Sequence, residues 1–218
     1  MKSNYKENNS NVCDAESSST CIAWFKLAEL VTRKEKEKTL SLYRLLSHSF
    51  DKAYALQVEG DILWALEDEQ AAQKYKEAAF LYKKEDKVFC AAAIYEHLCT
   101  IEPKNCDYLS KLIALYVLLH WPEKFEQKYE KLLNFFDDGV VSFDYALNFS
   151  KRIVDLASNK RNLQEDEESG IYFQKTEDCT SFNWILKSLP SVLIRNEEDT
   201  LLKNLEEYCL DQNLDFDS

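Results

Sequence analysis

Residues 72–105 constrain the fold more than any other part of the chain. They read AQKYKEAAFLYKKEDKVFCAAAIYEHLCTIEPKN. Apolar residues recur at helical spacing on both sides of the polar turn 83–87, which predicts two amphipathic helices joined by a short connection. Small residues stand where two such helices would touch. The segment therefore predicts a helical hairpin, and it contains no catalytic constellation.

The remainder of the chain is also predicted to be helical. The 218 residues include only 3 Gly and 3 Pro, which argues against folds that depend on many tight turns. The fold class is therefore all-α. Helices are predicted at about 21–31, 40–50, 52–66, 69–84, 87–101, 106–119, 122–136 and 141–157, then one within 171–194 that breaks at Pro190, and a last one at 197–210.

Four regions follow from this pattern. Residues 1–20 are polar and are expected to form a disordered tail. Residues 21–157 form the helical domain. Residues 158–170 hold a block of four acids and are expected to be an acidic linker. Residues 171–218 are expected to contribute C-terminal helices that pack on or cap the array.

The helices recur with a regular period. Predicted helix starts near 52, 69, 87, 106 and 122 are almost evenly spaced, and two helices together span about 34 residues. Within 72–105 the residues that carry this period are of three kinds. They are aromatic (Tyr75, Tyr82 and Tyr95), small (Ala78, Ala79 and Ala91) or proline (Pro103). Across about 21–136 the chain resembles the tetratricopeptide-repeat family. The resemblance implies an α-solenoid of stacked antiparallel helix pairs, wound as a right-handed superhelix.

The repeat frame is ambiguous. A frame that begins at residue 53 and one that begins at 72 overlap, so the helix at 69–84 is the second helix of one pair and the first of the next. Gly60 lies inside the helix before it. Because a helical Gly costs about 1 kcal/mol relative to Ala, a close approach of two helices is the expected compensation.

A second, weaker resemblance is to soluble NSF-attachment proteins, which are acidic helical adaptors. It implies binding to SNARE bundles and to an ATPase partner in membrane fusion. Two features differ from that family. The chain is shorter, and it ends in Asp215, Phe216, Asp217 and Ser218 where that family has a leucine-bearing tail.

The net charge and the absence of known catalytic or metal-binding motifs exclude several classes of function. The formal net charge is -12, which disfavours binding to a phosphate backbone. No segment reads as a signal peptide or membrane span, and no C-x-x-C pair occurs, so a reducing, cytoplasmic setting is expected. His48, His97 and His120 lie far apart and have no partners at ligand spacing. We therefore expect no catalysis, no cofactor and no metal site.

The expected function is recognition of another protein. The family geometry places ten residues on the surface that would face a partner: Tyr54, Gln57, Asp61, Trp64, Gln73, Lys76, Phe80, Lys83, Asp107 and Ser110. Ala114 and Val117 continue this face. Asp61 and Phe80 stand where a clamp for a C-terminal carboxylate would need Asn, so that kind of binding is disfavoured.

The sequence therefore predicts a non-catalytic adaptor or scaffold that binds a peptide or helix of a partner protein. One alternative is an attachment-protein-like adaptor in vesicle fusion. Another is a structural subunit of a larger assembly. Recovery of SNARE proteins with the chain would favour the first alternative, and an obligate oligomer the second.

Overall fold

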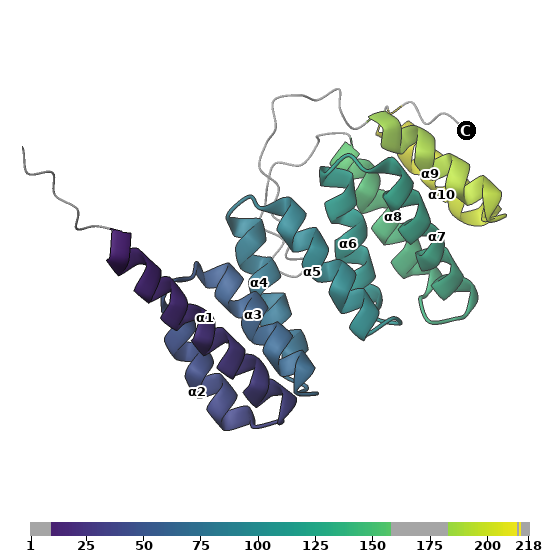
Figure 1. Cartoon of the computed structure of the whole chain (residues 1–218). Coiled ribbons are helices and arrows are strands. Elements are labelled where there is room, and N and C mark those ends of the chain that lie inside the picture. Colours follow the sequence, from purple (N-terminus) through teal and green to yellow (C-terminus); the bar gives the residue numbers. More distant parts are fainter. Residues whose placement is uncertain (1–9, 158–182, 213, 215–218) are drawn as a thin grey trace, which may run out of the picture. The chain divides into compact units, whose positions relative to one another are not determined.

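The computed structural model describes residues 10–157, 183–212 and 214, and the side chains of 21–156, 184–212 and 214. Within these residues the regular secondary structure is entirely helical (Figure 1). The helices are α1 (Ser10–Thr32), α2 (Lys36–Leu46), the short 3-10 helix η1 (Ser47–Ser49), α3 (Lys52–Ala65), α4 (Ala71–Lys84), α5 (Val88–Ile101), α6 (Cys106–Leu118), α7 (Pro122–Asp137), α8 (Phe143–Ala157), α9 (Asn183–Arg195) and α10 (Asp199–Asp211).

The prediction of an all-α chain is confirmed, and the helix bounds follow local signals. Asp51 precedes α3, and its carboxylate accepts a hydrogen bond from the Ala53 amide at 2.9 Å. Asn105 caps α6 by accepting from the amides of Asp107 and Tyr108. Pro122 opens α7 at a position where its missing N–H is not needed. These side chains satisfy or avoid the amides that a helix start leaves without partners.

Three elements differ from the predictions. Helix α2 spans Lys36–Leu46, four residues earlier at both ends than the predicted 40–50, and η1 follows it. Helix α1 begins at Ser10, so residues 10–20 are helical where the sequence predicts a tail. Helix α9 continues through Pro190, where the sequence predicts a break. Pro190 is itself buried, and so are Leu189, Val192 and Leu193 around it. Burial of this apolar face offsets the cost of an interior proline, about 3 kcal/mol. Residues 1–9 and the segment 158–182, which includes the predicted linker, lie outside the described residues.

The chain divides into two compact units, residues 1–78 and 79–218. The division falls inside α4, between Ala78 and Ala79. Residues 71–78 of α4 therefore lie in unit 1 and residues 79–84 lie in unit 2.

The core of unit 1 (residues 1–78) lies between α1, α2 and α3. Leu27, Tyr43 and Ile62 form its buried centre, and partly buried apolar side chains surround them. Helix α3 approaches α4 at Gly60, where a Cβ atom would lie 2.9 Å from two carbons of the Tyr75 ring. The close approach expected at this glycine is confirmed. The other small residues of α4 are also buried at Ala71, Ala78 and Ala79, whereas Ala72 is only partly buried.

Unit 2 (residues 79–218) is built around α6. From Tyr108 to Val117 each α6 side chain except that of Lys111 is buried. Helix α6 packs against α5, α7 and α8, and further along the unit α7 also packs against α9 and α8 against α10. Helices α6, α7 and α8 thus each contact the next helix and the one after it (Figure 1). This sequential packing is consistent with a helical repeat.

The turns that follow several of the helices recur at regular intervals along the chain. Lys34, Glu67, Asp86, His120 and Glu197 adopt left-handed backbone conformations just after a helix. At Glu67 and at His120, the amide of the next residue donates to a carbonyl five residues back, the pattern of a Schellman C-cap. The interval from Lys34 to Glu67 in unit 1 and the interval from Asp86 to His120 in unit 2 each match the repeat period of about 34 residues.

This spacing accounts for the two overlapping frames. The interval from Glu67 to Asp86 is only slightly longer than half of that period, so the same type of turn occurs on both sides of α4. Within the described residues, left-handed turns therefore follow both α3 and α4.

Candidate interaction surface

The ten predicted partner-facing residues divide between the units, and each group is described within its own unit. Six lie in unit 1: Tyr54, Gln57, Asp61, Trp64, Gln73 and Lys76. Four lie in unit 2: Phe80, Lys83, Asp107 and Ser110.

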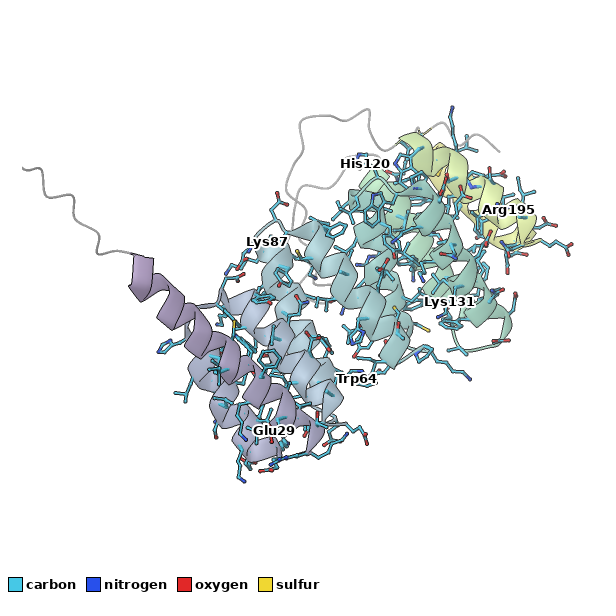
Figure 2. All side chains as sticks on the ribbon, viewed as in Figure 1. Glu29, Trp64, Lys87, His120, Lys131 and Arg195 are labelled. Carbon is cyan, nitrogen blue, oxygen red and sulfur yellow. The ribbon has the colours of Figure 1, made fainter. Side chains whose placement is uncertain are left out.

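In unit 1, α3 presents the clearest stripe. Tyr54, Gln57, Asp61 and Trp64 follow one another at spacings of three and four residues, which places them on one helix face. Tyr54 is 45% exposed and Trp64, which is labelled in Figure 2, is 46% exposed, so both side chains present large aromatic surface to solvent. Asp61 accepts a hydrogen bond from the Tyr75 hydroxyl at 2.7 Å. This bond holds the carboxylate beside the point where α3 meets α4.

The α4 residues of unit 1 are less exposed as a group. Gln73 is exposed and donates to the Glu77 carboxylate at 3.0 Å, one helical turn further along, whereas the Lys76 side chain is only partly buried. These two polar residues flank the buried Tyr75 rather than forming an apolar surface. The aromatic residues of α3 therefore dominate the candidate surface of unit 1.

In unit 2, the face of α6 that was predicted to bind a partner is covered by another helix. Ser110 is buried, and its hydroxyl lies 2.7 Å from that of Tyr145 on α8. Ala114 and Val117, further along the same face, are also buried. The α6 face expected to be open is thus covered because α8 packs against it. Phe80, in contrast, remains 40% exposed on α4.

Lys83 interacts electrostatically with Asp107, and Asp107 also acts on Tyr145, the hydrogen-bond partner of Ser110. We call the residues connected through these pairwise interactions the lysine–tyrosine cluster. Its members come from α4, α5, α6 and α8. The Lys83 ammonium lies 5.9 Å from the centre of the Tyr95 ring, and Lys111 pairs with Asp107 at 2.8 Å. The cluster consists of Lys83, Tyr95, Asp107, Ser110, Lys111, Tyr145 and Arg152.

The environment of the cluster alters its protonation equilibria. Burial, together with the repulsion of Lys111, lowers the pKa of Lys83 to about 8, and Asp107 acts in the opposite direction. Burial raises the pKa of Tyr145, while the hydrogen bond with Ser110 and the charge of Arg152 oppose that rise. Burial likewise raises the pKa of Tyr95. The fold therefore holds the Lys83 cation in a desolvated setting over the ring of Tyr95, whose hydroxyl stays protonated because burial raises its pKa.

The sequence did not predict Tyr95, Lys111, Tyr145 and Arg152 as members of this surface. Lys111 follows Asp107 by one helical turn, a spacing that predicts an ion pair. That spacing could have indicated that Lys111 lies beside the predicted residue Asp107. Tyr145 and Arg152 lie on α8, far beyond Ser110 in the sequence. Nothing in the repeat motif places that helix over α6.

A metal centre and a membrane span have no support in the described part of the chain. Among residues 10–157, 183–212 and 214, no group of three or more His, Cys, Asp or Glu side chains could hold a metal ion. No helix in these ranges is long and apolar enough to span a membrane. Comparison of the chain with protein-family models, curated proteins and solved structures finds no match. The function is therefore inferred from the residues themselves.

The desolvation of Lys83 leads to a direct prediction. With 13C-labelled lysine, one Lys side chain should titrate with a midpoint of about 8, well below the ordinary 10.5. That resonance should be absent in Lys83→Arg. Because the folded pKa is lowered, the unfolded chain binds this proton more tightly between pH 8 and 10.5. The contribution of Lys83 to stability should therefore rise with pH across that window. Uniform titration of all lysines near 10.5 would contradict the description of the cluster.

Proposed function

We propose that this protein is a non-catalytic adaptor that binds a peptide or helix of a partner protein on the face formed by the first helices of its repeats. In this proposal each unit is a segment of a tetratricopeptide-like α-solenoid, in which antiparallel helix pairs stack side by side. Recognition by such a surface relies on a few exposed aromatic anchors placed on rigid helices.

The observation that supports the proposal is the contrast between two sets of aromatic residues. The repeat tyrosines Tyr75, Tyr82, Tyr95, Tyr116 and Tyr129 are all buried in the core. Tyr54, Trp64 and Phe80, which fall outside that register, keep 40–46% of their surface exposed. Burying a large aromatic side chain is worth roughly 2–3 kcal/mol. Aromatic residues are enriched in protein–protein interfaces relative to the rest of the protein surface.

The experiment is affinity capture from a lysate of the source cell, with partners quantified by mass spectrometry. The double variant Trp64→Glu plus Phe80→Glu places a charge in the aromatic surface of each unit. We expect the partners recovered with the wild-type chain to fall by about tenfold or more, since loss of an aromatic anchor typically costs about 2 kcal/mol or more of binding free energy.

A matched double variant controls for exposed charge in general. Phe25→Glu on α1 and Leu210→Glu on α10 also change one exposed apolar residue in each unit, at 78% and 73% exposure. This control should retain the partners. Equal recovery with all three proteins would refute the proposed surface, and equal loss in both double variants would show that its location is wrong.

A further inference from the structure

Helix α7 separates its charged residues onto two faces. Glu126 and Glu130 lie one helical turn apart, and both form an ion pair with Arg195 of α9, at 2.9 and 3.0 Å. Three lysines at spacings of four and three residues share the opposite face of the helix: Lys124, Lys128 and Lys131. Packing against α9 therefore engages carboxylates of α7 and leaves its lysines on another side.

The lysine face of α7 lies beside α5. Lys124 pairs with Glu96 of α5 at 2.7 Å. The charge of Lys128 also acts on Glu96, and the charges of Lys128 and Lys131 act on Cys99, one turn further along α5. Lys124 is exposed, whereas Lys128 and Lys131, the latter labelled in Figure 2, are partly buried. In the part of the chain that the structure describes, Glu96 is the one carboxylate that pairs with these lysines, so the face has an excess of positive charge.

Two aromatic residues lie at the end of this face where α7 begins. Phe89 of α5 is 62% exposed, and its ring meets the Trp121 ring edge-on, with the ring centres 5.7 Å apart. The Lys124 ammonium lies 4.8 Å from the centre of the Trp121 ring, and the Tyr116 ring lies 5.8 Å from it. Trp121 thus contacts three side chains. Aromatic groups held in this way lose little conformational entropy when they bind a partner.

We propose that these residues form a docking surface for an extended acidic segment of another protein that carries one apolar side chain. We call the surface the basic–aromatic face, and it consists of Phe89, Glu96, Trp121, Lys124, Lys128 and Lys131. The apolar side chain packs on Phe89 and Trp121, and carboxylates pair with Lys128 and Lys131. The basic–aromatic face contains none of the ten predicted partner-facing residues. The inference therefore goes beyond the proposed function and does not depend on it.

Charge complementarity selects this occupant. The face has three lysines and one glutamate, although the whole chain has 39 acidic residues against 27 basic ones. Two copies of the chain repel each other, because each has a formal net charge of -12. A short acidic segment meets mainly the local charges, since those more than about 8 Å away are largely screened at physiological ionic strength. Complementary charges of this kind act chiefly on the choice of partner.

The geometry of α7 sets the spacing of groups in the segment. Lys128 and Lys131 follow Trp121 by seven and ten residues, which is about 10 and 15 Å along the helix axis. An extended chain advances about 3.3 Å per residue. The two carboxylates should therefore lie about three and five residues from the apolar side chain.

The test uses the full chain, immobilised, and a library of capped peptides as the probe. Each peptide has one fixed leucine and, three and five residues from it in either chain direction, two Glu or two Gln. The other positions are random and uncharged. At low salt the wild-type chain should retain Glu peptides about fivefold better than Gln peptides, which is the range of two exposed ion pairs. In 1 M salt the ratio should fall to about one, because such pairs are screened.

Two double variants locate the charge preference. Lys128→Gln plus Lys131→Gln should reduce the Glu-over-Gln ratio to less than about twofold, because it removes both cations that the carboxylates would meet. The matched control, Lys84→Gln plus Lys203→Gln, removes the same charge from two exposed lysines on α4 and α10 of the same unit. This control should keep the ratio. Thermal unfolding checks that each variant is folded.

Two single variants locate the apolar contact. Phe89→Ser should lower the retention of Glu and Gln peptides alike by about fivefold or more, since it removes the aromatic anchor. Leu210→Ser on α10 changes a more exposed apolar residue, at 73%, and should leave retention unchanged. The loss in Phe89→Ser should persist in 1 M salt, because an apolar contact is not screened.

Several outcomes would overturn the inference. They are equal retention of Glu and Gln peptides by the wild-type chain at low salt, equal losses in the two lysine double variants, or retention that does not depend on Phe89. A Glu preference that arises only after the acids at 165–168 are replaced by their amides would make this chain's own acidic segment the occupant. Self-association in sedimentation experiments that Phe89→Ser abolishes would assign the face to a second copy instead.

The variant Trp64→Glu plus Phe80→Glu separates this inference from the proposed function. It leaves the basic–aromatic face unchanged, so the Glu preference should persist in it. Loss of the preference in this variant would place the peptides on the surface already proposed and would overturn the second one. If the preference depends on Lys128 and Lys131 while lysate capture does not depend on Trp64 and Phe80, the basic–aromatic face stands and the proposed adaptor surface is wrong.

Discussion

Replacing Tyr129 by alanine is expected to lower the free energy of unfolding of unit 2 by about 3–5 kcal/mol. The Tyr129 ring is fully buried, stacked 5.7 Å from Phe125 and 6.5 Å from Phe149. It lies where α7 meets α8, so its loss leaves a cavity in the centre of the unit. Denaturant unfolding followed by far-UV circular dichroism measures the change. Trp184, 5.4 Å from Phe125, provides a fluorescence probe of the same region.

The matched control is Tyr129→Phe. The Tyr129 hydroxyl is hydrogen-bonded to that of Ser150, which also donates to the Ala146 carbonyl at 2.7 Å. Ser150 therefore keeps a partner when the phenol oxygen is removed, and we expect a loss of about 1 kcal/mol. A similar cost for the two substitutions would mean that the hydroxyl, and not the packing of the ring, stabilises this contact.

Replacing Gly60 by valine is expected to lower the free energy of unfolding of unit 1 by about 3 kcal/mol. A Cβ at this position would lie 2.9 Å from Tyr75 ring carbons, closer than real contacts allow. Tyr75 is itself buried, and its hydroxyl is held by Asp61, so the ring has little room to move. The α3–α4 contact would have to open. Trp24, stacked on Phe50 at 5.8 Å, reports unfolding of this unit by fluorescence.

A double-mutant cycle isolates the contact. Combining Gly60→Val with Tyr75→Leu removes the ring that meets the new methyl groups, so the two costs should be less than additive by at least about 1 kcal/mol. Additive costs would refute the proposed contact between Gly60 and Tyr75. Because the chain has two compact units, each transition is fitted separately, and a single cooperative transition is not assumed.

The candidate surface was predictable only in part. Trp64 and Phe80 are predicted to face a partner because they fall outside the repeat register, and both are exposed. Periodicity along one helix is a local property, so it separates the buried face from the open face where no third helix intervenes. Ser110 did not follow this rule. It is polar and lies on the expected open face, but Tyr145 of α8 covers it. Which helix covers a given face depends on packing between distant segments.

The sequence by itself determined that the chain is helical, where most of its helices begin and end, and which tyrosines are buried. Those properties depend on neighbours within about one helical turn or on the repeat period, both of which can be read along the chain. Only the tertiary structure decided two further points: the continuation of α9 through Pro190, and the position of Tyr145 of α8 against Ser110 of α6. These depend on burial free energy summed over segments far apart in the sequence, and that sum overrides local preferences of a few kcal/mol.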